Sequence, residues 1–293
     1  NIHILEHIDR LVEIFNACWP MYAAMPAVLK DAIERSYQKV GWDLRNSESE
    51  KGVFPTFFDL LDILPGVIEE SHYSKDTQSD YVGALCTRVK SLTNGIYGSV
   101  LCAEDALIDE ALFDCNVIVD LSRVGSMETK SLLMGILVMK LQEYRMCSSG
   151  MNSRLRHVTV LEEAHNLLRK TSAEQSQEGA NLQGKSVEML ANAIAEMRTY
   201  GEGFIIADQA PGLLDMSVIR NTNTKIILRL PDEEDRKLVG KSAALKEAQI
   251  DELSKLPLGV AAVYQNEWPE AVLCKIEAVS YTHLRAHETR GNL

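Results

Sequence analysis

The chain has 293 residues, of which 46% are hydrophobic and 25% charged, and these proportions are typical of a soluble globular protein. Its formal net charge of -12 excludes a surface that is basic throughout, so any nucleic-acid contact must come from a local patch or from the interior of an oligomer. The sequence contains no membrane-spanning segment, no secretory signal and no C-x-x-C pair among its six cysteines. We therefore expect a cytoplasmic protein with free thiols.

The first part of the chain, residues 1–114, contains helical patterns only. Apolar residues recur at helical spacing from His7 to Trp42, a stretch that two prolines divide into a pair of helices. Further helices are predicted at residues 54–68 and 81–92, and no strand is predicted before Cys115. These patterns predict a helical subdomain over residues 1–114.

From residue 115 onward, strands and helices alternate. Strands are predicted at residues 116–121, 157–161, 203–207 and 224–230, and helices at residues 128–144, 187–200 and 232–256. A hairpin of residues 259–264 and 271–276 completes the pattern. Continuous apolar strands separated by helices predict an α/β domain with a mostly parallel sheet over residues 115–279. Ligands of such sheets bind at the carboxyl ends of the strands, where we expect Asp120, Glu162, Glu163, Asp208 and Gln209.

The two ends of the chain are exceptional. Because it begins with Asn1 instead of methionine, we expect a fragment that is cut at its N-terminus. Residues 280–293 differ sharply in composition from the strand before them and resemble a peptide translated from sequencing-adapter DNA, so we expect a non-native tail. His283 and His287 in this tail imitate a metal-binding pair, but no third ligand accompanies them.

Two adjacent carboxylates, Glu162 and Glu163, follow the apolar run of residues 157–161. An unpaired acid at the end of a buried strand is costly to desolvate, which favours a functional role. In nucleotide hydrolases this arrangement is the Walker B element, whose first acid holds Mg²⁺ and whose second acid orients or deprotonates the attacking water. The alternative is a helix that begins here and carries acids in its first turn to suit the helix dipole. Asp120 ends a second candidate strand, which lacks the second carboxylate.

A literal phosphate-loop pattern, G-x-x-x-x-G-K-S, runs from Gly179 to Ser186. A true phosphate loop follows a buried strand, so that its backbone N–H groups and the next helix cradle the phosphates. Here the preceding residues 169–178 are polar, and the pattern follows the two-acid strand instead of preceding it. We therefore expect a loop that ends at a helix start.

The strand at residues 203–207 ends in Asp208 and Gln209. An amide at such an end can hydrogen-bond both a γ-phosphate oxygen and the attacking water. The alternative is a polar strand end that enters a Pro-Gly turn, which accounts for Asp208 better than for Gln209. Upstream, Arg198 lies at a predicted helix end, where an arginine can serve the last carbonyls or reach the nucleotide of a neighbouring subunit.

In their order along the chain, these motifs resemble the ATPase core of the HerA-like family, hexameric motors related to FtsK and to conjugation ATPases. The resemblance covers residues 116–276. It rests on D-L-S at 120–122, E-E-A-H-N-L-L at 162–168, A-E-M-R-T-Y-G-E-G-F-I-I-A-D-Q at 195–209 and N-x-x-T-K-I-I-L-R-L at 221–230. It implies a RecA-like P-loop NTPase core that uses ATP and Mg²⁺, and a homo-hexamer that acts on double-stranded DNA with a nuclease or secretion component as partner.

The resemblance also implies residue roles. Glu162 would bind Mg²⁺ and nucleotide, Glu163 would be the catalytic carboxylate, Gln209 the sensor and Arg198 an arginine finger acting in trans, with Arg229 as a weaker finger candidate. The family's Walker A strand should precede the helical segment, where this sequence has no such motif. We therefore expect a fragment of an ATP-hydrolysing DNA translocase that is inactive alone. The alternatives are a nucleotide-independent scaffold module and a metalloenzyme that uses Glu162, Glu163 and His165.

Overall fold

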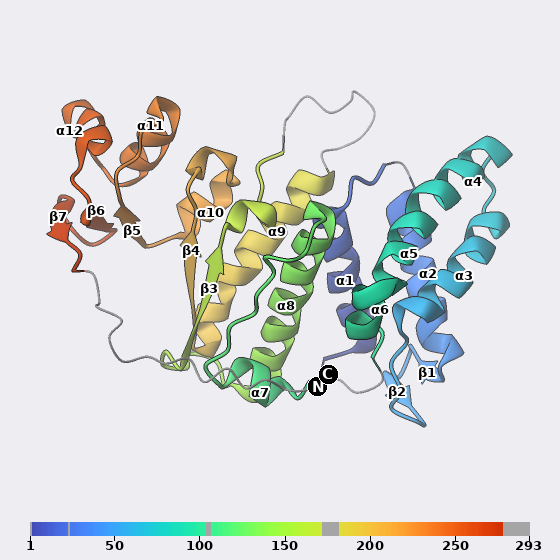
Figure 1. Ribbon diagram of the computed structural model, residues 1–293. Helices are drawn as coiled ribbons and strands as arrows, with labels where there is room; N and C mark the ends of the chain where they lie inside the picture. The colour runs from blue at the N-terminus through green and yellow to red at the C-terminus, as the bar shows by residue number, and fades with distance from the viewer. Residues whose placement is uncertain (1, 23, 104–106, 172–181, 278–293) are drawn as a thin grey trace. The chain divides into compact units, whose positions relative to one another are not determined.

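The computed structural model describes residues 2–22, 24–103, 107–171 and 182–277 (Figure 1). The chain divides into two compact units, Asn1–Asn221 and Thr222–Leu293. The expected tail, residues 280–293, lies outside the described part of the chain. All six cysteines carry free thiols. Over the described ranges, no helix combines the length and the apolar character that crossing a bilayer requires.

The first half of the first unit is helical, as the apolar periodicity predicts. Its helices are α1 (Ile4–Cys18), α2 (Met25–Lys39), α3 (Phe57–Glu70), α4 (Lys75–Tyr81), the π-helix η1 (Val82–Cys86), α5 (Thr87–Thr93), α6 (Gly95–Leu101) and α7 (Asp109–Phe113). A capping box fixes the start of α3, because the Asp59 carboxylate accepts the N–H of Thr56 at 2.9 Å. The short hairpin of β1 (Trp42–Asp43) and β2 (Glu48–Ser49) was not predicted, since two-residue strands show no periodicity.

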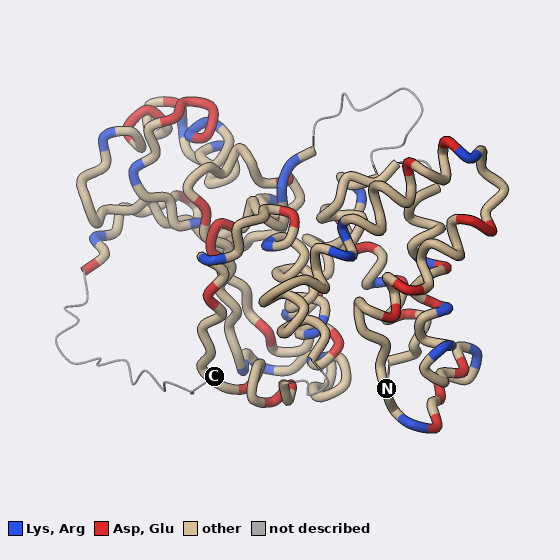
Figure 2. Tube along the Cα trace, turned by 45° about the vertical axis from the view of Figure 1, so that its right-hand side comes forward, with Lys and Arg blue, Asp and Glu red and all other residues tan. Residues whose placement is uncertain are grey.

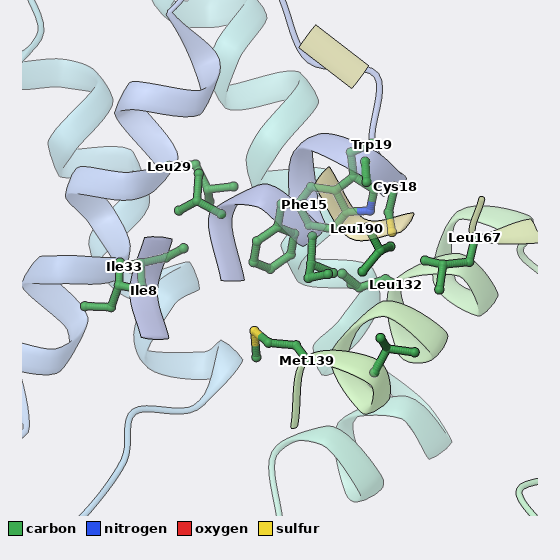
Figure 3. Close-up of a cluster of buried hydrophobic side chains, with 14 of the residues drawn as sticks. Ile8, Phe15, Cys18, Trp19, Leu29, Ile33, Leu132, Met139, Leu167 and Leu190 are labelled. Carbon is green, nitrogen blue, oxygen red and sulfur yellow. The ribbon is translucent and has the colours of Figure 1, made fainter. Parts of the chain in front are cut away.

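Helix α1 forms the centre of the first unit's core. It packs against α8 (Met127–Ser148) and α9 (Leu182–Glu196), and Figure 3 shows its Phe15, with the C-cap residue Trp19, among Leu132 and Leu190 of those helices. The backbones of α1 and α8 approach closely, because a Cβ on Gly135 would lie 2.6 Å from Ile14 Cγ2. The predicted subdomain boundary at residue 114 therefore lies inside one continuous core.

The parallel part of the fold is a ladder of two strands, β3 (His157–Glu162) and β4 (Glu202–Ala207). They lie side by side in Figure 1. One face of the ladder packs Leu161, Phe204 and Ile206 into the helical core, while Val158, Val160 and Ile205 on the other face are exposed. Parallel strands are usually covered on both faces, so the exposed second face departs from the expected pattern.

The prediction of a strand at residues 116–121 is wrong. In the described part of the chain no strand pairs with this segment, and Ile118 is 94% exposed. Asp120 consequently does not end a strand. Its carboxylate accepts the backbone N–H of Ser122 at 2.8 Å, which is the capping role of a loop aspartate. An apolar run forms a strand only where a neighbour completes its hydrogen bonds.

The second unit is a three-stranded antiparallel sheet with two helices. Its elements are β5 (Thr224–Ile227), α11 (Glu233–Ser242), α12 (Glu247–Glu252), the 3-10 turn η5 (Leu253–Lys255), β6 (Val260–Gln265) and β7 (Val272–Lys275). The predicted hairpin is confirmed as β6 and β7. Strand β5 is shorter than predicted and pairs antiparallel with β6. Its exposed Ile226 and buried Ile227 alternate, as in an antiparallel sheet with one face in solvent. The four acids that begin α11 appear as one red stretch in Figure 2.

Candidate functional site

The carboxyl ends of β3 and β4 lie next to each other. The register pairs Glu162 with Ala207, so the chain leaves the two strands at neighbouring positions. Glu162 is the last residue of β3 and Glu163 follows it, while Asp208 and Gln209 follow β4. Glu162, Glu163 and Gln209 are exposed at this edge. The structure thus brings together the acids and the amide as the parallel-sheet rule predicts.

The backbone of Glu163 has the left-handed conformation, with φ 48° and ψ 49°. This conformation costs a residue other than glycine about 1–2 kcal/mol, and such strain is concentrated at functional positions. Asn166 holds the turn, because its backbone N–H and its Nδ2 both donate to the Glu163 carbonyl at 2.9 Å. The alternative that the two acids begin an α-helix is wrong, since the chain enters the three-residue 3-10 turn η2 (Ala164–Asn166).

The Asp208 carboxylate joins the two strand ends. Its side chain is only 3% exposed, and its Oδ2 accepts the backbone N–H and the ring Nδ1 of His165 at 2.8 and 2.9 Å. Because a carboxylate only accepts, the His165 ring donates from Nδ1. The other oxygen, Oδ1, accepts the N–H of Ala210 at 2.9 Å. No local sequence pattern predicts this contact, because its partners are 43 residues apart.

The loops that follow the two strands make a second connection farther along. The N–H of Asp215 donates to the Leu168 carbonyl at 2.9 Å, and the N–H of Lys170 donates to the Leu213 carbonyl at 2.8 Å. Buried Leu167 and Leu168 anchor the first loop in the core of the unit. The candidate site therefore lies on two loops that backbone hydrogen bonds join.

Arg198 lies at the other end of β4. It belongs to the 3-10 turn η3 (Met197–Tyr200), which precedes the strand, whereas Gln209 follows the strand. Six strand residues span about 20 Å, so Arg198 does not reach the Gln209 edge of its own chain. The trans finger stays a prediction. Arg229, the weaker candidate, is exposed just after β5 in the second unit.

The literal phosphate-loop pattern does not form a phosphate loop in its described part. Gly184, Lys185 and Ser186 lie inside α9, and the Ser186 hydroxyl is buried and donates to Glu13 Oε2 at 2.6 Å. The helix begins earlier than the predicted residue 187, because α9 already includes Leu182. The residues before Leu182, including Gly179, lie outside the described ranges.

A second charged cluster, which sequence reasoning missed, lies at the amino ends of β3 and β4. Arg145 donates from Nε to Glu202 Oε2 at 2.9 Å and from Nη1 to Asp114 Oδ1 at 2.5 Å. His157 and Thr159 contact the other oxygen of Glu202 at 2.8 and 2.7 Å. The Arg145 and Glu202 side chains are 3% and 0% exposed. The hydrogen bond from Arg145 lowers the pKa of the Asp114 carboxyl.

The exposed carboxylates at the site are suitable ligands for a hard cation. Mg²⁺ in nucleotide sites is held by one or two carboxylates together with phosphate oxygens and water, and Glu162 offers such an oxygen pair to solvent. Over the part of the chain that the structure describes, no three His, Cys, Asp or Glu side chains form a metal-binding group. The arrangement fits a cation that arrives with a phosphate ligand better than a metal cage made by protein alone.

The fold has counterparts among solved structures. VirB4 of Thermoanaerobacter pseudethanolicus superposes with a TM-score of 0.67 at 20% identity, covering 94% of this chain and 70% of that one. The plasmid coupling protein TrwB in complex with ADP and Mg²⁺ gives 0.57 at 11% identity, covering 94% and 69%. The chain thus has the fold of the RecA-like P-loop NTPases, as predicted.

Two helicases are similar in sequence to part of this chain. No protein-family model matches the chain. The DNA double-strand break repair helicase HerA of Sulfolobus acidocaldarius is 33% identical over 122 residues, 41% of this chain and 22% of that protein. A probable helicase of Methanocaldococcus jannaschii is 30% identical over 121 residues, 41% and 21% of the two chains. The chain is therefore similar to these two helicases over 41% of its length, and the match spans about a fifth of each of them.

Proposed function

We propose that this chain supplies the hydrolysis side of the ATP site in a HerA-like, DNA-translocating motor. The observation that carries the proposal is the meeting of Glu162, Glu163 and Gln209 at the carboxyl edge of β3 and β4. The relation to helicases and the P-loop NTPase fold support the same class of motor.

In this proposal each residue at the edge has one role. The Glu163 carboxylate accepts a proton from the water that attacks the γ-phosphate, and the left-handed backbone at Glu163 sets the direction of that side chain. The Gln209 amide hydrogen-bonds a γ-phosphate oxygen and the same water. Glu162 holds Mg²⁺, which neutralises phosphate charge when it is bound. Positioning and electrostatic stabilisation supply most of the rate enhancement.

The remaining parts of the site come from outside these residues. We assign the phosphate-binding loop to a part of the complete protein that is not among the described residues, and Arg198 to the nucleotide of a neighbouring subunit. A ring of six copies would bring these parts together around double-stranded DNA in the cytoplasm, with a nuclease or secretion component as partner. A ring also suits the acidic chain, because DNA contacts can then be confined to the channel.

The experiment is steady-state ATP hydrolysis by the complete protein that contains this chain, with Glu163→Gln. We expect kcat to fall at least about 100-fold, since loss of a general base costs about 10²–10⁴. The affinity for ATP should stay within about twofold, because the amide keeps the shape of the side chain. Glu188→Gln, on an exposed glutamate of α9, is the matched control and should leave kcat unchanged. Turnover near the wild-type rate in Glu163→Gln would refute the catalytic assignment.

One observation favours a second candidate, a nucleotide-independent scaffold. Residues 182–186 are the described part of the literal phosphate-loop pattern. They are helical, and the Ser186 side chain is buried. If the complete protein fails to bind a fluorescent ATP analogue while it still assembles, the scaffold function replaces the motor.

A further inference from the structure

Asp208 is the most heavily engaged side chain at the edge, yet its carboxylate faces inward. Both oxygens accept hydrogen bonds, from the backbone and ring of His165 on one side and from the backbone of Ala210 on the other. Ala210 follows Gln209 directly, and His165 lies two residues after Glu163. Asp208 therefore fixes the backbone on both sides of the sensor amide and also the turn that carries the catalytic acid.

We propose that Asp208 and His165 form a positioning pair that holds Gln209 and Glu163 in the mutual geometry that hydrolysis needs. This inference rests on the proposed function and assigns neither residue a direct contact with nucleotide. Misplacement of a reacting group by about 1 Å can reduce the rate about 100-fold. A contact that joins the two elements therefore acts on kcat more than on ATP affinity.

The buried position of Asp208 supports a role beyond stability. A carboxylate that is 3% exposed is costly to desolvate, and backbone contacts at Leu168 and Leu213 already join the same loops. His165, by contrast, is 21% exposed, so its ring reaches the surface of the site. The pair thus lies between the core of the unit and the edge at which Glu163 and Gln209 are exposed.

The chain offers a matched control for Asp208. In the loop that follows, Asp215 Oδ1 accepts the N–H of Ser217 at 2.9 Å, which is the same geometry as Asp208 with Ala210. The side chain of Asp215 makes this local contact to α10 (Met216–Asn221), whereas that of Asp208 also binds the turn after β3. Asp215→Ala therefore removes a loop aspartate of the same kind and leaves the positioning pair intact.

The test measures kcat and ATP affinity for variants of the complete protein, with thermal unfolding of each. We expect Asp208→Ala to reduce kcat about 10- to 100-fold while ATP affinity stays within about twofold. Asp215→Ala should keep kcat within about twofold of the wild type. His165→Ala should lose about tenfold in kcat, and His165→Asn should regain most of it, because an asparagine Nδ2 can donate from nearly the position of the ring Nδ1.

Each outcome decides the inference. It is overturned if Asp208→Ala resembles Asp215→Ala in kcat, or if ATP affinity falls as much as kcat. If Asp208→Ala does not fold, the two His165 variants decide, and equal kcat values for them overturn the pair. Glu163→Gln in the same series separates the two proposals. An inactive Glu163→Gln with a fully active Asp208→Ala refutes only the positioning pair, whereas an active Glu163→Gln refutes the proposed function on which the pair rests.

Discussion

The two ends of the β3–β4 ladder both gather charged residues but use them differently. At the amino end, Arg145 and Glu202 are buried and bind each other. At the carboxyl end, Glu162 and Glu163 are exposed, and Glu163 has a strained backbone. The first arrangement satisfies its charges internally, while the second exposes them to solvent. Charge alone therefore does not distinguish the candidate site, but charge together with exposure and strain does.

The largest expected effect is a loss of stability at the amino end of the ladder. Arg145→Met leaves the Glu202 carboxylate buried without its cation, and we expect the free energy of unfolding to fall by about 3–5 kcal/mol. Urea unfolding followed by circular dichroism measures this loss. Arg35→Met, which breaks exposed ion pairs with Asp31 and Glu70, should cost within about 1 kcal/mol. Equal losses in the two variants would show that the amino-end cluster is not a structural centre.

At the carboxyl end, relief of backbone strain should raise the free energy of unfolding instead of lowering it. Glu163→Gly removes the side chain that makes a left-handed backbone costly, so we expect the free energy of unfolding to rise by up to about 1 kcal/mol while ATP turnover is lost. Ala244 has φ 55° and is exposed in the second unit, and Ala244→Gly should gain stability without losing turnover. A Glu163→Gly variant that is clearly less stable than the wild type would contradict the assignment of strain.

A smaller effect concerns the acid stability of the amino end. Because Arg145 lowers the pKa of Asp114, the stabilisation from this pair is complete above the ordinary pKa of the carboxyl, about 3.9, and is lost as the pH falls through the lowered value. Asp114→Asn should therefore reduce the melting temperature at pH 7 and flatten its decline below about pH 4. Asp76→Asn, on an exposed aspartate of α4, is the control. Parallel melting curves for Asp114→Asn and the wild type would rule out this contribution.

Local patterns in the sequence predicted most elements and the edge of the sheet at which the candidate site residues lie. The spacing of apolar residues located the helices, and the runs before Glu162 and Asp208 located the two parallel strands. Contacts between distant residues were beyond such patterns. Neither the pairing of Arg145 with Glu202, 57 residues apart, nor the contact of His165 with Asp208 has a local signature.

The error at residues 116–121 has the same origin. The apolar run of Val117, Ile118 and Val119 satisfies every local criterion for a strand, but strand formation depends on a partner elsewhere in the chain. The pairing of β5 shows the same limit, because four residues could not distinguish a parallel from an antiparallel neighbour. Sequence periodicity thus predicts what a segment can form, while the neighbours determine what it does form.

The exposed run at residues 117–119 also has a practical consequence for work with the isolated chain. An exposed apolar segment that pairs with no strand of the described residues is a place where a second molecule can add a strand. Concentrated preparations are therefore expected to aggregate through this segment, at a distance in sequence from every residue of the candidate site. Low protein concentration and low temperature, which slow intermolecular pairing and weaken hydrophobic association, favour a monodisperse sample.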